Sequence, residues 1–295
     1  MRRLPSAAEE DDDGMKDSST HDTKLGVLHA GPTAIDHLPE LVRDMGQSRA
    51  LILVDASTGG EARAHVERAL SEASMPARVV EMAGGPDRDG DVDGVARVLA
   101  QFAGGALVSV GDSALIATGK AVALLASNPL RRPGQQPQTR PRAHIAVPTA
   151  LGLAEEATSV VTLGPYAETF EDDGLLAVAV IDERVFPESD PETGHFKRLA
   201  VALAACTVID DTATLRDSTL ALSAVHHLVG AQTRPVEVRQ ALTLATAGHR
   251  RGPSCPRCKG GTVLPAAALD DPGSPAQTCL QQAVARGLTV GATSP

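Results

Sequence analysis

Aromatic residues are almost absent from this chain, which has one tyrosine, four phenylalanines and no tryptophan among its 295 residues. Stacking platforms for nucleobases are therefore scarce, and the core has to be built from alanine, valine and leucine. Net positive charge is lacking as well, because the formal charge is −10 at pH 7. A basic footprint is not expected, so the composition predicts no nucleic-acid partner.

Cysteines are few, and long hydrophobic runs are missing. Four cysteines in a chain of this length do not make a disulfide framework. No apolar run approaches the ~20 residues of a membrane span. Arg2 and Arg3 are followed by acidic residues, whereas a secretory signal continues into an apolar core. The sequence therefore predicts a soluble, cytoplasmic protein that has no membrane partner.

The hydrophobic pattern divides the chain into three parts. Residues 1–22 are polar and acidic without periodicity, which predicts a disordered tail. Residues 23–190 alternate strand-like and helix-like runs, which predicts an α/β domain with a parallel sheet and an exposed, extended loop at 128–142. Residues 191–295 indicate a shortened all-helical domain with a weakly patterned C-terminal end. Strands are expected at 24–31, 49–57, 77–83, 106–111, 143–150, 159–163 and 175–182, and helices at 32–46, 60–74, 91–105, 114–127, 195–210, 214–231 and 235–250.

One strand-to-helix joint has the composition of an anion site. In VSVGDSALIATGKAVALLA, residues 108–126, an apolar run enters a short turn of small residues, and a helix with Lys120 follows. A helix N-terminus at such a turn can hold a phosphate through its backbone amides. Asp112 stands in the same turn and would repel that anion, so weakened binding and a rearranged loop both stay open. The alternative is an ordinary joint that uses glycine and serine for backbone reasons.

Two further segments lie where strands are expected to end. Asp55 closes the run LILVD, where a carboxylate can bind ribose hydroxyls and disfavour an extra phosphate, unless it serves as a helix N-cap. Thr149 lies in AVPTALGLAEEAT, residues 146–158, which predicts a turn at the carboxyl edge of the sheet. Open α/β folds bind ligands at that edge, although a loop of capping residues is the plainer interpretation of this segment alone.

Taken in order, these motifs resemble the iron-containing alcohol dehydrogenase superfamily, including its maleylacetate reductase branch, over roughly Lys24 to Gly230. The likeness is best at GDSALIATGKAVALLA and at VPTALGLAEEATS. It implies a dinucleotide-binding α/β domain followed by a helical domain, the dehydroquinate synthase-like fold, and NAD(P)-linked interconversion of an alcohol and a carbonyl. The resemblance also implies a site for NAD, with NADP less favoured, that is formed by Asp55, Gly111, Asp112, Ser113, Ala114, Lys120 and Thr149.

The metal site of that superfamily is not matched. Its relatives carry an Asp and a His four residues apart on one helix, and no such pair follows Asp182. Aligning HHLVGA with a family His segment places Ser223 and Glu237 at or near two ligand positions. The sequence therefore predicts that a metal is absent, and the same alignment makes His227 the candidate for proton transfer.

The leading hypothesis is an oxidoreductase acting on a small-molecule or peptide carbonyl or alcohol, without metal, in a biosynthetic pathway. The alternative is an inactive family member that acts as a partner or regulatory subunit, with 131–142 as a docking segment. A homo-oligomer or a pathway partner fits either hypothesis.

Two shorter motifs have plainer interpretations. DRDGDVDG, residues 87–94, lacks the final glutamate of a calcium loop and is expected to be an acidic surface turn. CPRCKGG, residues 255–261, is half of a zinc knuckle without a second CxxC, and an aberrant C-terminal end is a further alternative.

Overall fold

A computed structural model describes residues 19–23, 26–55, 58–82, 88–128, 135–163, 168–208, 213–228 and 234–248. The strands are β1 (Ser19–Thr23), β2 (Gly26–Gly31), β3 (Arg49–Asp55), β4 (Ala77–Met82), β5 (Gly105–Gly111), β6 (His144–Pro148), β7 (Val160–Leu163), β8 (Glu168–Glu171) and β9 (Val178–Asp182). The α-helices are α1 (Leu38–Asp44), α2 (Gly60–Glu72), α3 (Arg88–Gln101), α4 (Ser113–Ser127), α5 (Thr193–Val208), α6 (Leu215–Leu228) and α7 (Pro235–Gly248). Single 3₁₀ turns are η1 (Ala34–His37), η2 (Glu155–Ala157), η4 (Asp173–Leu175) and η5 (Glu183–Val185).

Seven strands form the main sheet in the order β1-β2-β9-β6-β5-β3-β4. Every neighbouring pair is parallel except β1 and β2, which pair antiparallel at one edge. The chain passes from β3 outward to β4 and then returns to β5 on the other side of β3. The strand order therefore reverses between β3 and β5, which makes that boundary a topological switch point.

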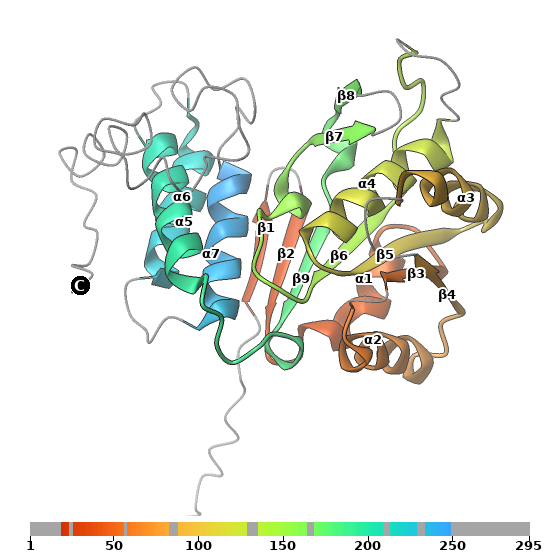
Figure 1. Ribbon diagram of the computed structural model, residues 1–295, viewed down its shortest axis with the longest axis horizontal. Helices are drawn as coiled ribbons and strands as arrows, with labels where there is room; N and C mark the ends of the chain where they lie inside the picture. The colour runs from red at the N-terminus through yellow and green to blue at the C-terminus, as the bar shows by residue number, and fades with distance from the viewer. Residues whose placement is uncertain are drawn as a thin grey trace, which may run out of the picture.

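The continuous apolar run of β3 is explained by helices on both faces of the sheet (Figure 1). Ala50, Ile52 and Val54 pack into one core together with side chains of α1 and α2. Leu51 and Leu53 point to the opposite face and pack with α3 and α4. Successive strand side chains alternate between faces, so a strand covered on both sides has no polar position. The predicted parallel α/β domain is confirmed.

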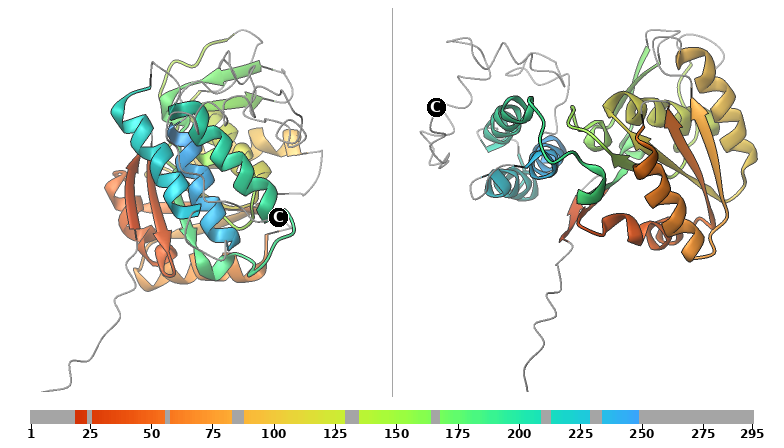
Figure 2. Two further views of the ribbon diagram at one scale, coloured as in Figure 1. Left: turned by 90° about the vertical axis from the view of Figure 1, so that its left-hand side faces the viewer. Right: turned by 60° about the horizontal axis from the view of Figure 1, so that its bottom comes forward.

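The last three helices form a bundle beside the sheet, as the sequence predicts. Their mostly alanine, leucine and valine side chains share one core with Leu28 and Ala30 of β2 and with Ala179 and Ile181 of β9. Figures 1 and 2 show α7 next to the sheet, with α5 and α6 on its outer side. Within the described residues, no helix is long and apolar enough to cross a membrane.

The N-terminal edge of the sheet differs from expectation. The segment 19–22 falls in the predicted disordered tail, but it belongs to β1, whose Ser19 pairs with Ala30 and Thr23 with Gly26. The reason is tertiary, because the strand forms through its backbone pairing with β2. A local pattern of polar residues does not carry that information.

The expected strand at 159–163 forms as β7, but outside the main sheet. It pairs antiparallel with β8, and the register joins Val161 to Phe170. The acidic motif at 87–94 also differs from its expected surface turn, because α3 begins at Arg88 and includes its remainder. The cysteine motif at 255–261 lies outside the described residues.

Candidate functional site

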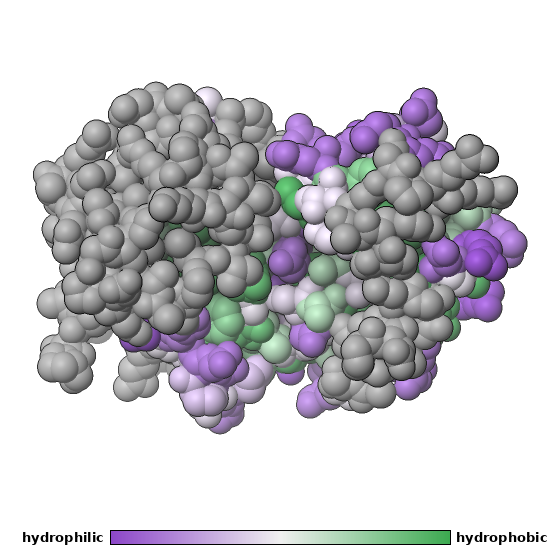
Figure 3. All heavy atoms as spheres, turned by 45° about the horizontal axis from the view of Figure 1, so that its top comes forward, coloured by the Kyte–Doolittle hydropathy of each residue, from purple (hydrophilic) through white to green (hydrophobic). Residues whose placement is uncertain are grey.

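The ends of β3 and β5 bring two of the predicted site segments together at the carboxyl edge of the sheet. These strands are hydrogen-bonded neighbours, with Ile52 opposite Val108, and they end at Asp55 and Gly111. Ligands of open α/β sheets bind beyond the strand ends at a switch point. The start of α4 at this edge contacts α7 through Ser113 and Arg239. Figure 3 shows hydrophilic and hydrophobic residues mixed between the two parts of the molecule.

Asp112 is the N-cap of α4. Its carboxylate accepts a hydrogen bond from the backbone amide of Leu115 at 2.8 Å, and its backbone is extended, with φ −76°. The residue therefore needs no left-handed conformation, and the loop is well formed with aspartate in this place. The amides of Ser113 and Ala114 are the first in the helix and have no intrahelical acceptor. The carboxylate of Asp112 therefore already provides one negative charge at this helix N-terminus.

Gly111 has no Cβ atom, which lets the side chains of Thr58 and Leu115 lie close to the end of β5. A Cβ atom there would lie 2.6 Å from Cδ2 of Leu115 and 3.1 Å from Oγ1 of Thr58. The carbonyl of Gly111 accepts a bond from the amide of Thr149 at 3.0 Å, so the end of β6 is tied to the end of β5. The structure thus brings Thr149 next to the Gly111–Ala114 segment.

Asp55 is buried, with 3% of its surface exposed. Its Oδ1 accepts hydrogen bonds from the amide of Thr58 at 2.8 Å and from the Thr58 hydroxyl at 3.0 Å. Thr58 also donates from Oγ1 to the carbonyl of Val110 at 2.9 Å, which joins the β3–α2 turn to β5. The carboxylate therefore closes a turn beside the switch point.

Lys120 is fully engaged by the protein. Its ammonium group donates to the carbonyls of Glu155 at 2.9 Å and Val160 at 2.7 Å, and to the hydroxyl of Thr158. Burial lowers the pKa of Lys120 to about 8, although the neighbouring carboxylates of Glu155 and Glu156 act in the opposite direction. An ammonium group has three donors, so all of them are used to hold the segment between β6 and β7 against α4.

Ser113 and Arg239 connect the α/β part to the helical part. The Ser113 hydroxyl accepts from the Leu153 amide at 3.0 Å and from Nη1 of Arg239, on α7, at 3.3 Å. Nη2 of Arg239 lies 2.6 Å from Oε2 of Glu156, and both side chains are completely buried. Thr243 donates to the other carboxylate oxygen of Glu156 at 2.7 Å. A buried ion pair with added hydrogen bonds therefore fixes α7 against the N-terminus of α4.

His227 lies on α6, away from this gathering. α6 packs against α5 and α7, and α7 is the helix of this bundle that meets η2 and β9 (Figures 1 and 2). His226 is exposed and His227 is half-buried, so the two neighbours face different ways as expected on a helix. Among the described residues, no three His, Cys, Asp or Glu side chains are grouped to hold a metal ion. The ligand set that the family resemblance implies is therefore not present in this part of the chain.

Sequence reasoning missed Arg239 and Glu156. A signal was available for Arg239, which interrupts the apolar stretch of α7 between Val238 and Ala241. A cation in the middle of an apolar helix needs a buried partner. Its partner could not be read from the sequence, because Glu156 is 83 residues away.

Comparison with known proteins agrees with this geometry. The family model "Iron-containing alcohol dehydrogenase" matches residues 27–188, more than half of the chain. The solved iron-containing alcohol dehydrogenase of Thermococcus thioreducens superposes with a TM-score of 0.58 and 20% identity, over 76% of this chain and 65% of that one. The iron-containing alcohol dehydrogenase of Thermotoga maritima superposes with a TM-score of 0.60 and 15% identity, over 81% of this chain and 70% of that one. At these identities the structures show the fold.

Two relatives with named activities match as well. The sulfoacetaldehyde reductase of Bifidobacterium kashiwanohense, solved with NAD⁺, gives a TM-score of 0.57 and 17% identity over 80% of this chain and 66% of that chain. The maleylacetate reductase of Agrobacterium tumefaciens gives 0.53 and 16% over 80% and 65%, so its branch is not singled out. The chain spans about two thirds of the length of these structures. No curated protein sequence matches it. On the family model and the fold, the chain belongs to the iron-containing alcohol dehydrogenase family.

Proposed function

We propose that this chain binds NAD(H) at the carboxyl edge of its sheet and acts as an oxidoreductase between an alcohol and a carbonyl. The observation that carries the proposal is the meeting of Asp55 and the Gly111–Ala114 turn on adjacent strands at the switch point. One solved relative contains NAD⁺. When bound, the nicotinamide supplies the hydride chemistry, and the chain binds and orients it.

The residues at the carboxyl edge have two proposed roles, which are contact with the cofactor and positioning of neighbouring segments. The amides of Ser113 and Ala114 would donate to the pyrophosphate at the start of α4. Thr149 follows the neighbouring strand end, and the family resemblance assigns Asp55, which closes the turn after β3, to the ribose. Lys120 acts as a positioning residue, because its three donors hold the segment after β6. His227 lies on α6, which packs against α5 and α7, so we assign the proton donor to no described residue.

The proposal includes no metal. The family name implies iron, but the described residues do not offer three grouped ligands, so no step is routed through a metal. We therefore favour a metal-independent reductase, of the kind that the resemblance to the maleylacetate reductase branch suggests. The substrate class stays a small-molecule or peptide carbonyl or alcohol.

Titration with NADH and NADPH, followed by nicotinamide fluorescence, tests the proposal. We expect saturable NADH binding that is tighter than NADPH binding. Asp112→Asn keeps a capping oxygen and removes the negative charge, so it should tighten NADH binding by about tenfold, which corresponds to ~1.4 kcal/mol. The matched control is Asp44→Asn, at the end of α1, which should leave the affinity unchanged. If neither the wild type nor Asp112→Asn binds either cofactor, the proposal is wrong.

A second candidate function rests on the same carboxylate. Asp112 caps α4 with a negative charge where a pyrophosphate would bind, which favours an inactive member retained as a partner or regulatory subunit. The inactive member and the enzyme are expected to differ in NADH binding. The wild type would not bind NADH, whereas Asp112→Asn would restore measurable affinity to an otherwise intact scaffold.

A further inference from the structure

A cavity of about 320 Å³ lies at the amino edge of the sheet, opposite the candidate site. Its walls come from the turn after α1, from the segment that enters β6, and from the loop after η4. β6 begins at His144 in this lining and runs to Pro148 at the carboxyl edge, so the two regions lie at opposite ends of one strand. The volume is at the lower end of the range for small-molecule sites.

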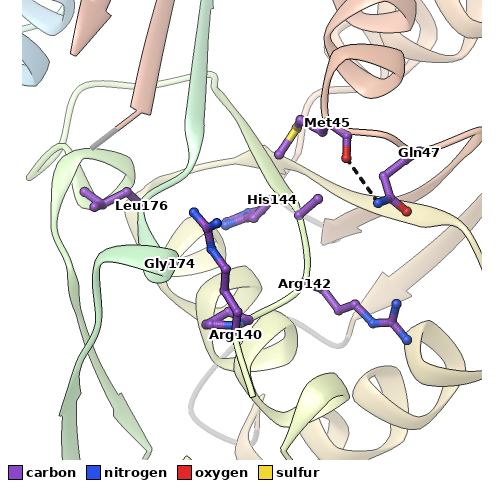
Figure 4. A pocket seen from close by; sticks show the side chains of 9 residues that line it. Met45, Gln47, Arg140, Arg142, His144, Gly174 and Leu176 are labelled. Atoms are coloured by element: carbon purple, nitrogen blue, oxygen red, sulfur yellow. Dashed lines mark hydrogen bonds between the residues drawn. The ribbon is translucent and has the colours of Figure 1, made fainter. Parts of the chain in front are cut away.

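Two arginines enter this lining, and neither has an acidic partner among the described residues. Figure 4 shows the guanidinium of Arg140 beside the ring of His144, while Arg142 extends on the other side of the segment. Nε of Arg142 is buried without a hydrogen-bond partner. The lining has no aspartate or glutamate. Its net charge is therefore positive, although the chain as a whole is acidic.

His144 adds a buried polar atom to the cavity. The side chain is 97% buried, and its Nε2 pairs with the hydroxyl of Ser109 at 2.9 Å, whereas Nδ1 has no partner. Burial, with a smaller effect from Lys120, lowers the pKa of His144 to about 3, so the ring is neutral at neutral pH. If the Ser109 hydroxyl donates to Nε2, the ring proton is on Nδ1 and needs an acceptor.

One acid, Asp172, lies next to the lining residue Gly174. Oδ1 of Asp172 accepts the amide of Gly174 at 2.6 Å. A Cβ atom on Gly174 would lie 2.8 Å from that oxygen and 3.0 Å from Cγ of Arg140, so a side chain cannot fill this part of the wall. Met45 and Leu176 supply apolar wall elsewhere.

We propose that this cavity binds a small organic phosphate, whose anionic group is held between Arg140 and Nδ1–H of His144. Guanidinium groups match the geometry of phosphate oxygens, and the apolar wall suits an organic remainder. The site is separate from the proposed NAD site, so a ligand here could be bound together with the cofactor.

Calorimetric titration of the full chain with inorganic phosphate, against acetate at equal ionic strength, tests the proposal. We expect saturable phosphate binding that weakens roughly tenfold in Arg140→Gln, and less in Arg142→Gln, because the Arg142 side chain extends on the other side of the segment. Arg78→Gln, on the exposed edge strand β4, removes the same charge elsewhere and should have no effect. Circular dichroism of each variant checks folding, and Arg142→Lys, which keeps the charge, replaces Arg142→Gln if that variant unfolds.

The two proposed sites can be told apart in the same experiment. Phosphate binding at the amino edge should be unchanged by Asp112→Asn and by saturating NADH, whether or not the NAD proposal holds. Absence of saturable phosphate binding in the wild type would overturn the inference. So would phosphate binding that responds to Asp112→Asn and not to Arg140→Gln, because the anion would then lie at the start of α4.

Discussion

Lys120 is predicted to contact the cofactor, and in the structure its ammonium group is bound by other parts of the chain. The sequence predicts the helix that carries it and the position of the lysine on that helix. The structure adds three acceptors, Thr158 and the carbonyls of Glu155 and Val160, which lie 35 to 40 residues further along the chain. Their meeting depends on the fold of the segment after β6, which no local pattern describes.

We expect Lys120→Met to reduce the free energy of unfolding by about 2 kcal/mol, because it leaves buried carbonyl groups without donors. Urea unfolding would measure this loss, with Lys197→Met on α5 as the control. NADH affinity of the folded variant should change by less than about threefold. A large loss of affinity with little loss of stability would instead place Lys120 in contact with the cofactor.

His144 gives a pH dependence whose sign follows from its burial. Its pKa is about 3 in the folded chain, whereas an ordinary exposed imidazole has a pKa of 6.5. Between these values the unfolded chain binds one more proton, so stability falls as the pH falls through this window. From pH 7 to pH 5 this residue alone should remove about 2 kcal/mol.

Urea unfolding at pH 7 and pH 5 measures the effect. His144→Gln keeps a polar group near Ser109 and should lose about 2 kcal/mol less than the wild type over this interval. His226→Gln, at an exposed position of α6, should follow the wild type. Equal pH dependence in wild type and His144→Gln would show that the ring is not buried in its neutral form.

At the scale of elements, α7 is attached to the α/β part by one completely buried ion pair. Arg239 approaches Glu156 of η2 at 2.6 Å and the Ser113 hydroxyl of α4 at 3.3 Å. Periodicity predicts α7 and its buried face, but it does not tell which element the face covers. The pairing therefore decides how the helical part meets the edge where the cofactor is proposed to bind.

Glu156→Gln should cost about 3 kcal/mol in urea unfolding, because Arg239 is left as an unpaired buried charge. Adding Arg239→Met removes that charge, so the double variant should be more stable than the sum of the two single losses predicts. Additive losses would mean that the two side chains do not interact. Arg234→Met, whose ion pair with Glu183 is half-exposed, is a control expected to cost less than about 1 kcal/mol.

At the scale of the whole molecule, the described residues have the family fold without a grouped set of metal ligands. We expect dialysis against a chelator to leave the melting temperature and the NADH affinity unchanged. Elemental analysis before dialysis should find no stoichiometric iron or zinc. A tightly held metal whose removal destabilises the chain would contradict this, and its loss in Cys255→Ser would assign it to the cysteine motif at 255–258.

The sequence by itself determined most strands and helices of the α/β part, since runs buried on both faces and amphipathic helices are recorded in local periodicity. It did not predict β1 or β8. It also determined the turn at Gly111–Ala114 and the family resemblance. The tertiary structure alone decided that β7 leaves the main sheet and that Arg239 meets Glu156. Each of these depends on which distant groups become neighbours, and that choice is set by packing and hydrogen-bond pairing over the whole molecule.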